Sequence, residues 1–244
     1  MKKVAVLLSL ALIIGICCVP AFAEDNKEII AKADELYDAG TLASYKEAKT
    51  LLEPLIGKDE EATWKFSRAS YQIGVRTTNK ETRKAIFEKS FKAVEAYINA
   101  GSTVPGTNYW YALNAGQYGK LKGVLKSLFL VKPMKKACNN VIAKDPGFED
   151  GSAYTVLGAI EYEVPGGDLD KCITLCKKKL GYEPDDMTAN LYLGKTYYKK
   201  KDYATAKKYI EHMIATAKPK TANDKEDVAE AKELLIEINK KLAK

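Results

Sequence analysis

Residues 187–219 read MTANLYLGKTYYKKKDYATAKKYIEHMIATAKP, and the architecture of the chain can be worked out from this segment. Its apolar residues recur at helical spacing on both sides of a short polar turn, which predicts two amphipathic helices joined as a hairpin. Asp202 stands at the turn and can cap the second helix. Gly194 and Ala206 have little or no side chain, so we expect the two helices to approach most closely there.

The hairpin matches the tetratricopeptide repeat (TPR), a helix-turn-helix unit with a period of about 34 residues. A second copy precedes it, with Gly158 in the place of Gly194. In this copy Cys172 and Cys176 take the small and the large apolar position of the second helix. Both thiols are therefore expected to pack between helices.

Weaker copies of the pattern cover 25–57 and 60–101, and residues 223–242 continue as one amphipathic helix. A solenoid needs such a helix to cover its last open face. The sequence therefore predicts an all-α, TPR-like superhelix of five antiparallel helix pairs with a C-terminal capping helix. No linker rich in Pro, Gly or Ser divides it, so residues 24–244 are expected to form one helical domain.

The first 23 residues differ from the rest in composition. Two lysines precede an apolar run from Val4 to Val19, and Ala21-Phe22-Ala23 follows. This order is typical of a secretory signal peptide, here 1–23. The rival interpretation is a membrane anchor, but the run is shorter than the roughly 20 residues of a spanning helix. We therefore expect an exported, periplasmic protein.

The five cysteines fall into two groups. Cys17 and Cys18 lie in the predicted leader, where lipidation is an alternative that would anchor the protein to the membrane, although Ile16 fits a lipobox poorly. An odd number remains, which is no disulfide framework. The spacing also predicts no metal site. These three are Cys138, Cys172 and Cys176.

The charge pattern is only mildly basic. The formal net charge is +7 for the whole chain. Lysine runs at 177–179 and 199–201 are surrounded by acids and are interpreted as solvated helix ends, with anionic lipid headgroups as the alternative and no nucleic-acid role. His212 is the only histidine. Without a nucleophile–base pair, a metal cluster or a cofactor loop, the sequence predicts a protein that is not an enzyme and has no cofactor.

Further motifs lie between residues 107 and 167, where a helix is expected to begin at Pro133. They are Trp110-Tyr111-Ala112-Leu113-Asn114, Gly116-Gln117-Tyr118-Gly119, Ser127-Leu128-Phe129-Leu130-Val131, Asp145-Pro146-Gly147-Phe148, Leu157-Gly158 and Pro165-Gly166-Gly167. In this order they resemble the TPR-type accessory proteins (T components) of tripartite ATP-independent periplasmic (TRAP) transporters. The chain departs from that pattern at Tyr118, where a tryptophan is typical, and at 151–154.

The resemblance implies a periplasmic homotrimer that docks onto the solute-binding protein of a TRAP transporter. It also implies an apolar cleft or pore that passes a small hydrophobic or organic-acid ligand. The alternative is a generic periplasmic TPR scaffold that binds peptides or envelope proteins in its concave groove.

Candidate binding residues follow from the solenoid geometry, because the first helix of each pair lines the concave face. The seven candidates are Trp110, Asn114, Gln117, Tyr118, Tyr154, Glu161 and Tyr192. Asn114 either bonds a backbone group between helices or meets a ligand, and Trp110 occupies a position that normally packs. The apolar run 127–131 is expected to be buried core, with a pore wall or a trimer interface as alternatives.

Overall fold

A computed structural model describes the backbone of residues 21–243, and the side chains from Asn26 onward. The predicted leader, 1–23, falls almost wholly outside the described residues and stays a prediction. Within the described part, helices follow one another without a strand. Their bounds are α1 Ala21–Asp38, α2 Leu42–Leu52, η1 Glu53–Leu55, α3 Glu60–Arg76, α4 Lys80–Asn99, α5 Pro105–Lys122, η2 Val124–Leu130, α6 Val131–Lys144, η3 Phe148–Gly151, α7 Ser152–Glu163, α8 Leu169–Leu180, α9 Met187–Lys199, α10 Tyr203–Thr216 and α11 Ala222–Leu242.

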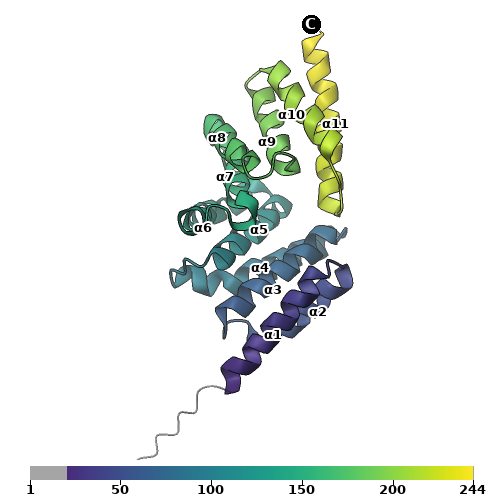
Figure 1. Ribbon diagram of the computed structural model, residues 1–244. Coiled ribbons are helices and arrows are strands. Elements are labelled where there is room, and N and C mark those ends of the chain that lie inside the picture. Colours follow the sequence, from purple (N-terminus) through teal and green to yellow (C-terminus); the bar gives the residue numbers. More distant parts are fainter. Residues whose placement is uncertain (1–20, 244) are drawn as a thin grey trace, which may run out of the picture.

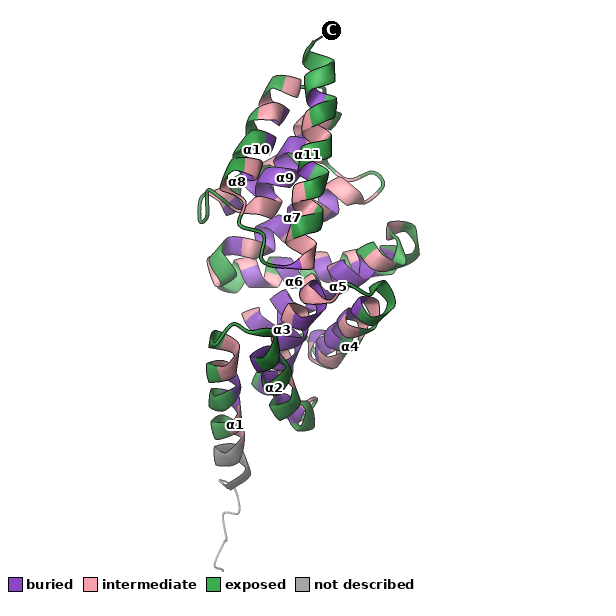
Figure 2. Ribbon diagram, turned by 90° about the vertical axis from the view of Figure 1, so that its right-hand side faces the viewer, coloured by how far each residue is buried: buried purple, intermediate pink, exposed green. Residues whose placement is uncertain are grey.

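Successive helices pack as pairs: α1 with α2, α3 with α4, α5 with α6, α7 with α8, and α9 with α10. The pairs stack along the molecule, and α11 runs beside the upper ones (Figure 1). Buried residues follow the faces that each helix turns toward its neighbours (Figure 2). The predicted all-α superhelix of helix pairs with a C-terminal helix is confirmed.

Close approach between paired helices occurs at the predicted glycines. A Cβ atom on Gly194 would lie 2.3 Å from Ile210 Cδ1, and one on Gly158 would lie 2.8 Å from Cys176 Sγ. Any side chain at either position would push the helices apart. Cys172 and Cys176 have no exposed surface, in agreement with their expected packing role.

The segment between α5 and α6 differs from prediction. Helix α6 begins at Val131, two residues before Pro133, which sits in the first turn where its missing N–H costs nothing. The preceding run forms the 3₁₀ helix η2. With about three residues per turn, only every third side chain faces inward. Ser127 and Leu130 are buried, but Leu128 and Phe129 are exposed, so the expected burial of 127–131 was wrong for these two.

Helix α11 does more than cover the last pair. Its N-terminal part reaches back to α3 and α4, where Arg83 of α4 donates to Glu226 and Asn223 of α11. The superhelix is thus closed across its concave side, and α11 contributes a wall to the space inside.

Candidate functional site

The concave side contains a cavity of about 320 Å³. Helices α5 and α7 supply most of its lining, and residues of α3, η2, α6, η3, α9, α11 and two loops complete it. Its volume lies at the lower end of the range of small-ligand sites, roughly 300–1,000 Å³. The cavity lies on the concave face, which is the usual binding face of TPR-like solenoids.

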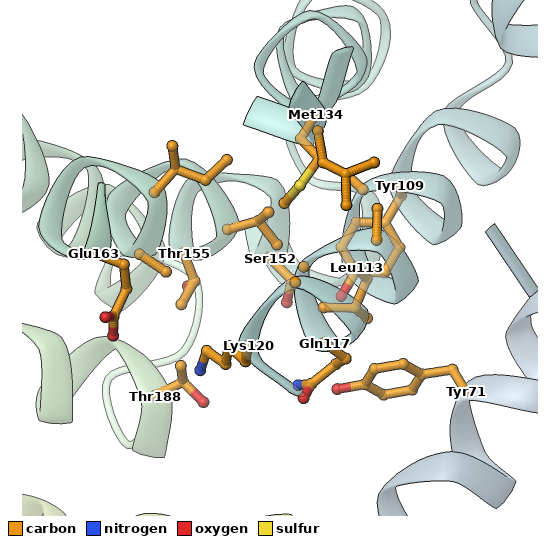
Figure 3. A pocket seen from close by; sticks show the side chains of 18 of the residues that line it. Tyr71, Tyr109, Leu113, Gln117, Lys120, Met134, Ser152, Thr155, Glu163 and Thr188 are labelled. Atoms are coloured by element: carbon orange, nitrogen blue, oxygen red, sulfur yellow. The ribbon is translucent and has the colours of Figure 1, made fainter. Parts of the chain in front are cut away.

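The cavity has an apolar side and a polar side. Figure 3 shows Met134 at one end of the cavity and Lys120, Gln117 and Thr188 at the other, with Leu113 between them. The apolar wall consists of Leu113, Val124, Leu130, Val131, Met134, Val156, Ala159, Ile160 and Val164. Such a wall excludes water from an apolar group, and the polar side can fix its orientation.

The lining carries more acids than bases. Its carboxylates are Glu149, Glu163, Asp186 and Asp227, and its one lysine is Lys120. Burial raises the pKa of Glu149 and of Asp186. The excess of negative charge favours a group that brings a cation.

Asp227 is the acid that stands apart. Burial raises its pKa to about 6, although Lys120 and Lys195 nearby act in the opposite direction. In the described part of the chain its carboxylate forms no salt bridge, and its one side-chain hydrogen bond comes from Asn223 Nδ2 at 3.5 Å. A partly desolvated carboxylate that forms no salt bridge is costly to the free protein and available to a ligand.

The other acid of this side is already partnered. Glu163 Oε1 accepts from the Tyr192 hydroxyl at 3.0 Å and lies 3.6 Å from Lys195 Nζ. Burial and the neighbouring Glu163 raise the pKa of Tyr192 well above its ordinary value, so the phenol stays a donor. Lys195 in turn reaches Glu230 of α11 at 2.6 Å.

Two buried polar atoms at the cavity lack a partner. They are Trp110 Nε1 and Thr155 Oγ1, and both side chains belong to the lining. Each atom is covered from solvent, so a bound group reaches it only after the side chain rotates. A buried donor without an acceptor costs about 1–3 kcal/mol.

Of the seven predicted site residues, Trp110, Gln117 and Tyr192 line the cavity. The side chain of Gln117 points toward the hydroxyl of Tyr71 in Figure 3. The three residues come from two different helix pairs. Whether they contact a ligand stays a prediction.

The other four predicted residues are placed elsewhere. Asn114 Nδ2 donates to Trp110 O at 2.8 Å and to Ser67 O at 3.3 Å, so it joins α3 to α5. The remaining contacts are those of Tyr118 with Phe91, Tyr154 with Tyr182, and Glu161 with Lys135, Lys171 and the amide of Asp168. These contacts occupy all four side chains within the free protein.

Sequence reasoning missed several lining residues. Lys120 could have been found, since it follows Gln117 by one turn of the same helix. Asp227 could not, because its place depends on the path of α11 back across the groove. His212, the only histidine, is exposed on α10 and bonds Asp185 at 2.9 Å; it is not part of the cavity.

These features define a TPR-like helical superhelix whose groove is bridged by α11. A thermophilic TPR protein from Thermus thermophilus has the same fold, with a TM-score of 0.58 and 14% sequence identity over 86% of this chain and 98% of that one. The model of the family "Regulator of microtubule dynamics protein 1-3" matches residues 29–167, which is more than half of the chain. The chain therefore belongs to this family.

A curated relative agrees with the family match. Regulator of microtubule dynamics protein 3 of Rattus norvegicus is 23% identical over 143 residues. The matched part is 58% of this chain but only 30% of the relative. The match thus spans less than a third of that protein's length.

The family match overturns the TRAP interpretation and what depended on it. The chain is not assigned to the T components, and the TRAP solute-binding partner, the passage of a transported ligand, the trimer and the periplasmic or lipid-anchored location were wrong. The shared motifs have a packing origin: a Cβ on Gly167 would lie 2.1 Å from Glu161 O, and Gly158 sits against Cys176. Such positions report how helix pairs stack and not what they bind.

Proposed function

We propose that this chain is a non-enzymatic, protein-binding member of its family, and that it holds a segment carrying an apolar and a basic side chain in the groove closed by α11. The observation that carries the proposal is the unpaired carboxylate of Asp227 beside an apolar cavity. The fold and the regulator-type family both support a binding role in place of catalysis.

The cavity has a complementary surface for each part of such a segment. Its apolar wall around Leu113 and Met134 suits an aliphatic or aromatic side chain. The surplus of acids, with Asp227 forming no salt bridge in the described residues, suits a lysine or an arginine. Trp110 Nε1 and the Thr155 hydroxyl can satisfy a backbone carbonyl once their side chains rotate. Binding of such a segment therefore removes the free-energy costs of the Asp227 carboxylate and of the two unpartnered polar atoms in the free protein.

Fluorescence polarisation with labelled peptides tests this proposal. The probes pair one leucine with one lysine or arginine at varied spacing, and matched peptides replace the basic residue with glutamate. We expect selection of the basic set. Asp227→Asn should weaken its binding about tenfold, the equivalent of 1.4 kcal/mol, and Leu113→Trp should block the cavity.

Glu233→Gln, an exposed change on the same helix, is the matched control and should leave binding unchanged. Equal affinity for basic and acidic peptides, or full affinity in Asp227→Asn, would overturn the proposal.

A second candidate follows from the family itself. The matched region, 29–167, includes the α3, α5 and α7 walls of the cavity. Regulation of microtubule dynamics, the activity in the relative's name, is therefore a candidate for this chain as well. Co-sedimentation with polymerised tubulin tests it; a chain that stays in the supernatant at every tubulin concentration would exclude direct binding.

A further inference from the structure

An apolar surface lies outside the cavity, on η2. Leu125, Leu128 and Phe129 are 73%, 41% and 62% exposed. They make up three of the nine large hydrophobic residues that are exposed in the described part of the chain, and they fall within five consecutive positions. We call these three residues the η2 patch. Its exposure follows from the 3₁₀ geometry, because Ser127 and Leu130 take the inward positions.

The η2 patch stands in a strongly basic region. From Ala96 to Lys144 the sequence contains seven lysines and not one Asp, Glu or Arg. Six of these lysines are exposed: Lys120, Lys122, Lys126, Lys132, Lys136 and Lys144. Lys122 Nζ lies 5.3 Å from the ring centre of Phe129, so charge and apolar surface are interleaved.

The surroundings do not neutralise this charge. Glu88 of α4 is influenced by the charge of Lys122, but its carboxylate already pairs with Lys92 at 2.7 Å. Lys135 is the member of the basic stretch that has an acidic partner, Glu161. For Lys126 and Lys132 no salt bridge exists within residues 26–243. The face therefore combines free positive charge with exposed leucine and phenylalanine.

We propose that the η2 patch and its lysines dock peripherally on an anionic lipid membrane. Leucine and phenylalanine enter the interface between headgroups and acyl chains, and lysines contact the anionic headgroups. An acidic protein surface would complement the lysines but leave three adjacent apolar side chains without a use. No described helix is long and apolar enough to cross a bilayer.

Vesicle co-sedimentation of the full chain tests the proposal. We expect binding to vesicles of phosphatidylcholine with phosphatidylserine, a decline with added salt, and little binding to phosphatidylcholine alone. Leu125→Ser/Phe129→Ser should lower the affinity at least tenfold. Lys126→Gln/Lys132→Gln should lower it by up to about fivefold for each lysine.

Matched controls lie on α11. Ile236→Ser removes an equally exposed apolar side chain, and Lys225→Gln/Lys232→Gln removes two exposed lysines. Both controls should bind like the parent chain, and circular dichroism verifies folding of every variant. Equal binding to both vesicle types, or parent-like binding of the η2 variants, would overturn the proposal. Loss of a dimer in Phe129→Ser, without vesicle binding by the parent, would instead assign the patch to self-association.

Discussion

Arg83 Nη1 donates to Glu226 Oε1 at 2.8 Å, although 143 residues separate the two in sequence. Arg83 is nearly fully buried, whereas the Glu226 side chain is 61% exposed. The same guanidinium donates to Asn223 Oδ1 at 2.8 Å. The contact ties the N-terminal part of α11 to α4 and closes the groove beside Asp227.

Loss of the Arg83–Glu226 contact should destabilise α11 more than the rest of the fold. Arg83→Ala should lower the free energy of unfolding by about 1–3 kcal/mol, because it removes packing and leaves two acceptors unpaired. Glu226→Gln should cost less than about 1 kcal/mol, since that partner is exposed. Urea unfolding gives the values. Hydrogen exchange should speed up in 222–228, and unchanged exchange there would mean that α11 is held by its other contacts.

Much of the fold could be predicted because it depends on local spacing. Gly158 and Gly194 mark close helix contacts through the absence of a side chain, and this can be recognised in the sequence alone. The path of α11 could not be predicted, because the Arg83–Glu226 contact joins distant residues. The lining of the cavity could accordingly be predicted only in part. Trp110, Gln117 and Tyr192 follow from the rule that the first helix of each pair lines the concave face, but Asp227 does not.

The wrong assignment to the TRAP family also came from motifs that reflect local packing. Motifs such as Pro165-Gly166-Gly167 are constrained by backbone packing, so unrelated functions can share them.

The close contact at Gly194 predicts a substitution effect with a rescue. Gly194→Ala should cost about 1–3 kcal/mol, because the new methyl group would overlap Ile210 Cδ1 and Cγ1. Ile210→Val in the same chain should recover part of that loss, since it removes Cδ1. Gly147→Ala is the control: its Cβ would meet the nearest atoms at 3.6 Å and its φ is −91°, so stability should hold or rise. Additive losses in the Gly194/Ile210 pair would show that the overlap is relieved in another way.

Asp227 makes stability depend on pH. Its pKa rises from 3.8 in the unfolded chain to about 6 in the fold. The folded state therefore holds its proton more tightly, and its contribution to stability is lost as the pH rises from about 4 through about 6. Asp227→Asn should stabilise the protein at pH 8 by at most about 3 kcal/mol, less in proportion to its solvent contact, and the gain should vanish below about pH 4. Urea titrations of both proteins across this range measure the difference, and a gain that does not vary with pH would assign it to another cause.

The buried thiols should be inert while the protein is folded. Burial raises the pKa of Cys138 to about 12, and the hydrogen bond with Cys172 together with burial raises the pKa of Cys176, so neither forms a thiolate near neutral pH. Alkylation followed by mass spectrometry should find Cys138, Cys172 and Cys176 unmodified in buffer and fully modified in denaturant. Rapid modification of any of the three in buffer would indicate local opening of its helix pair.

Substitutions of Thr155 test stability and binding separately. Its hydroxyl is buried without a partner, so Thr155→Val, which keeps the shape, should raise the free energy of unfolding by about 1 kcal/mol. Thr155→Ser keeps the hydroxyl, loses a methyl group and should be destabilising. If the hydroxyl is retained for a bound segment, Thr155→Val should bind the basic peptides more weakly than the parent does, whereas Thr155→Ser should retain more of the affinity. Urea unfolding and peptide polarisation on the same preparations measure both effects. A valine variant that is less stable would mean that the hydroxyl already has a partner, such as a water molecule, in the free protein.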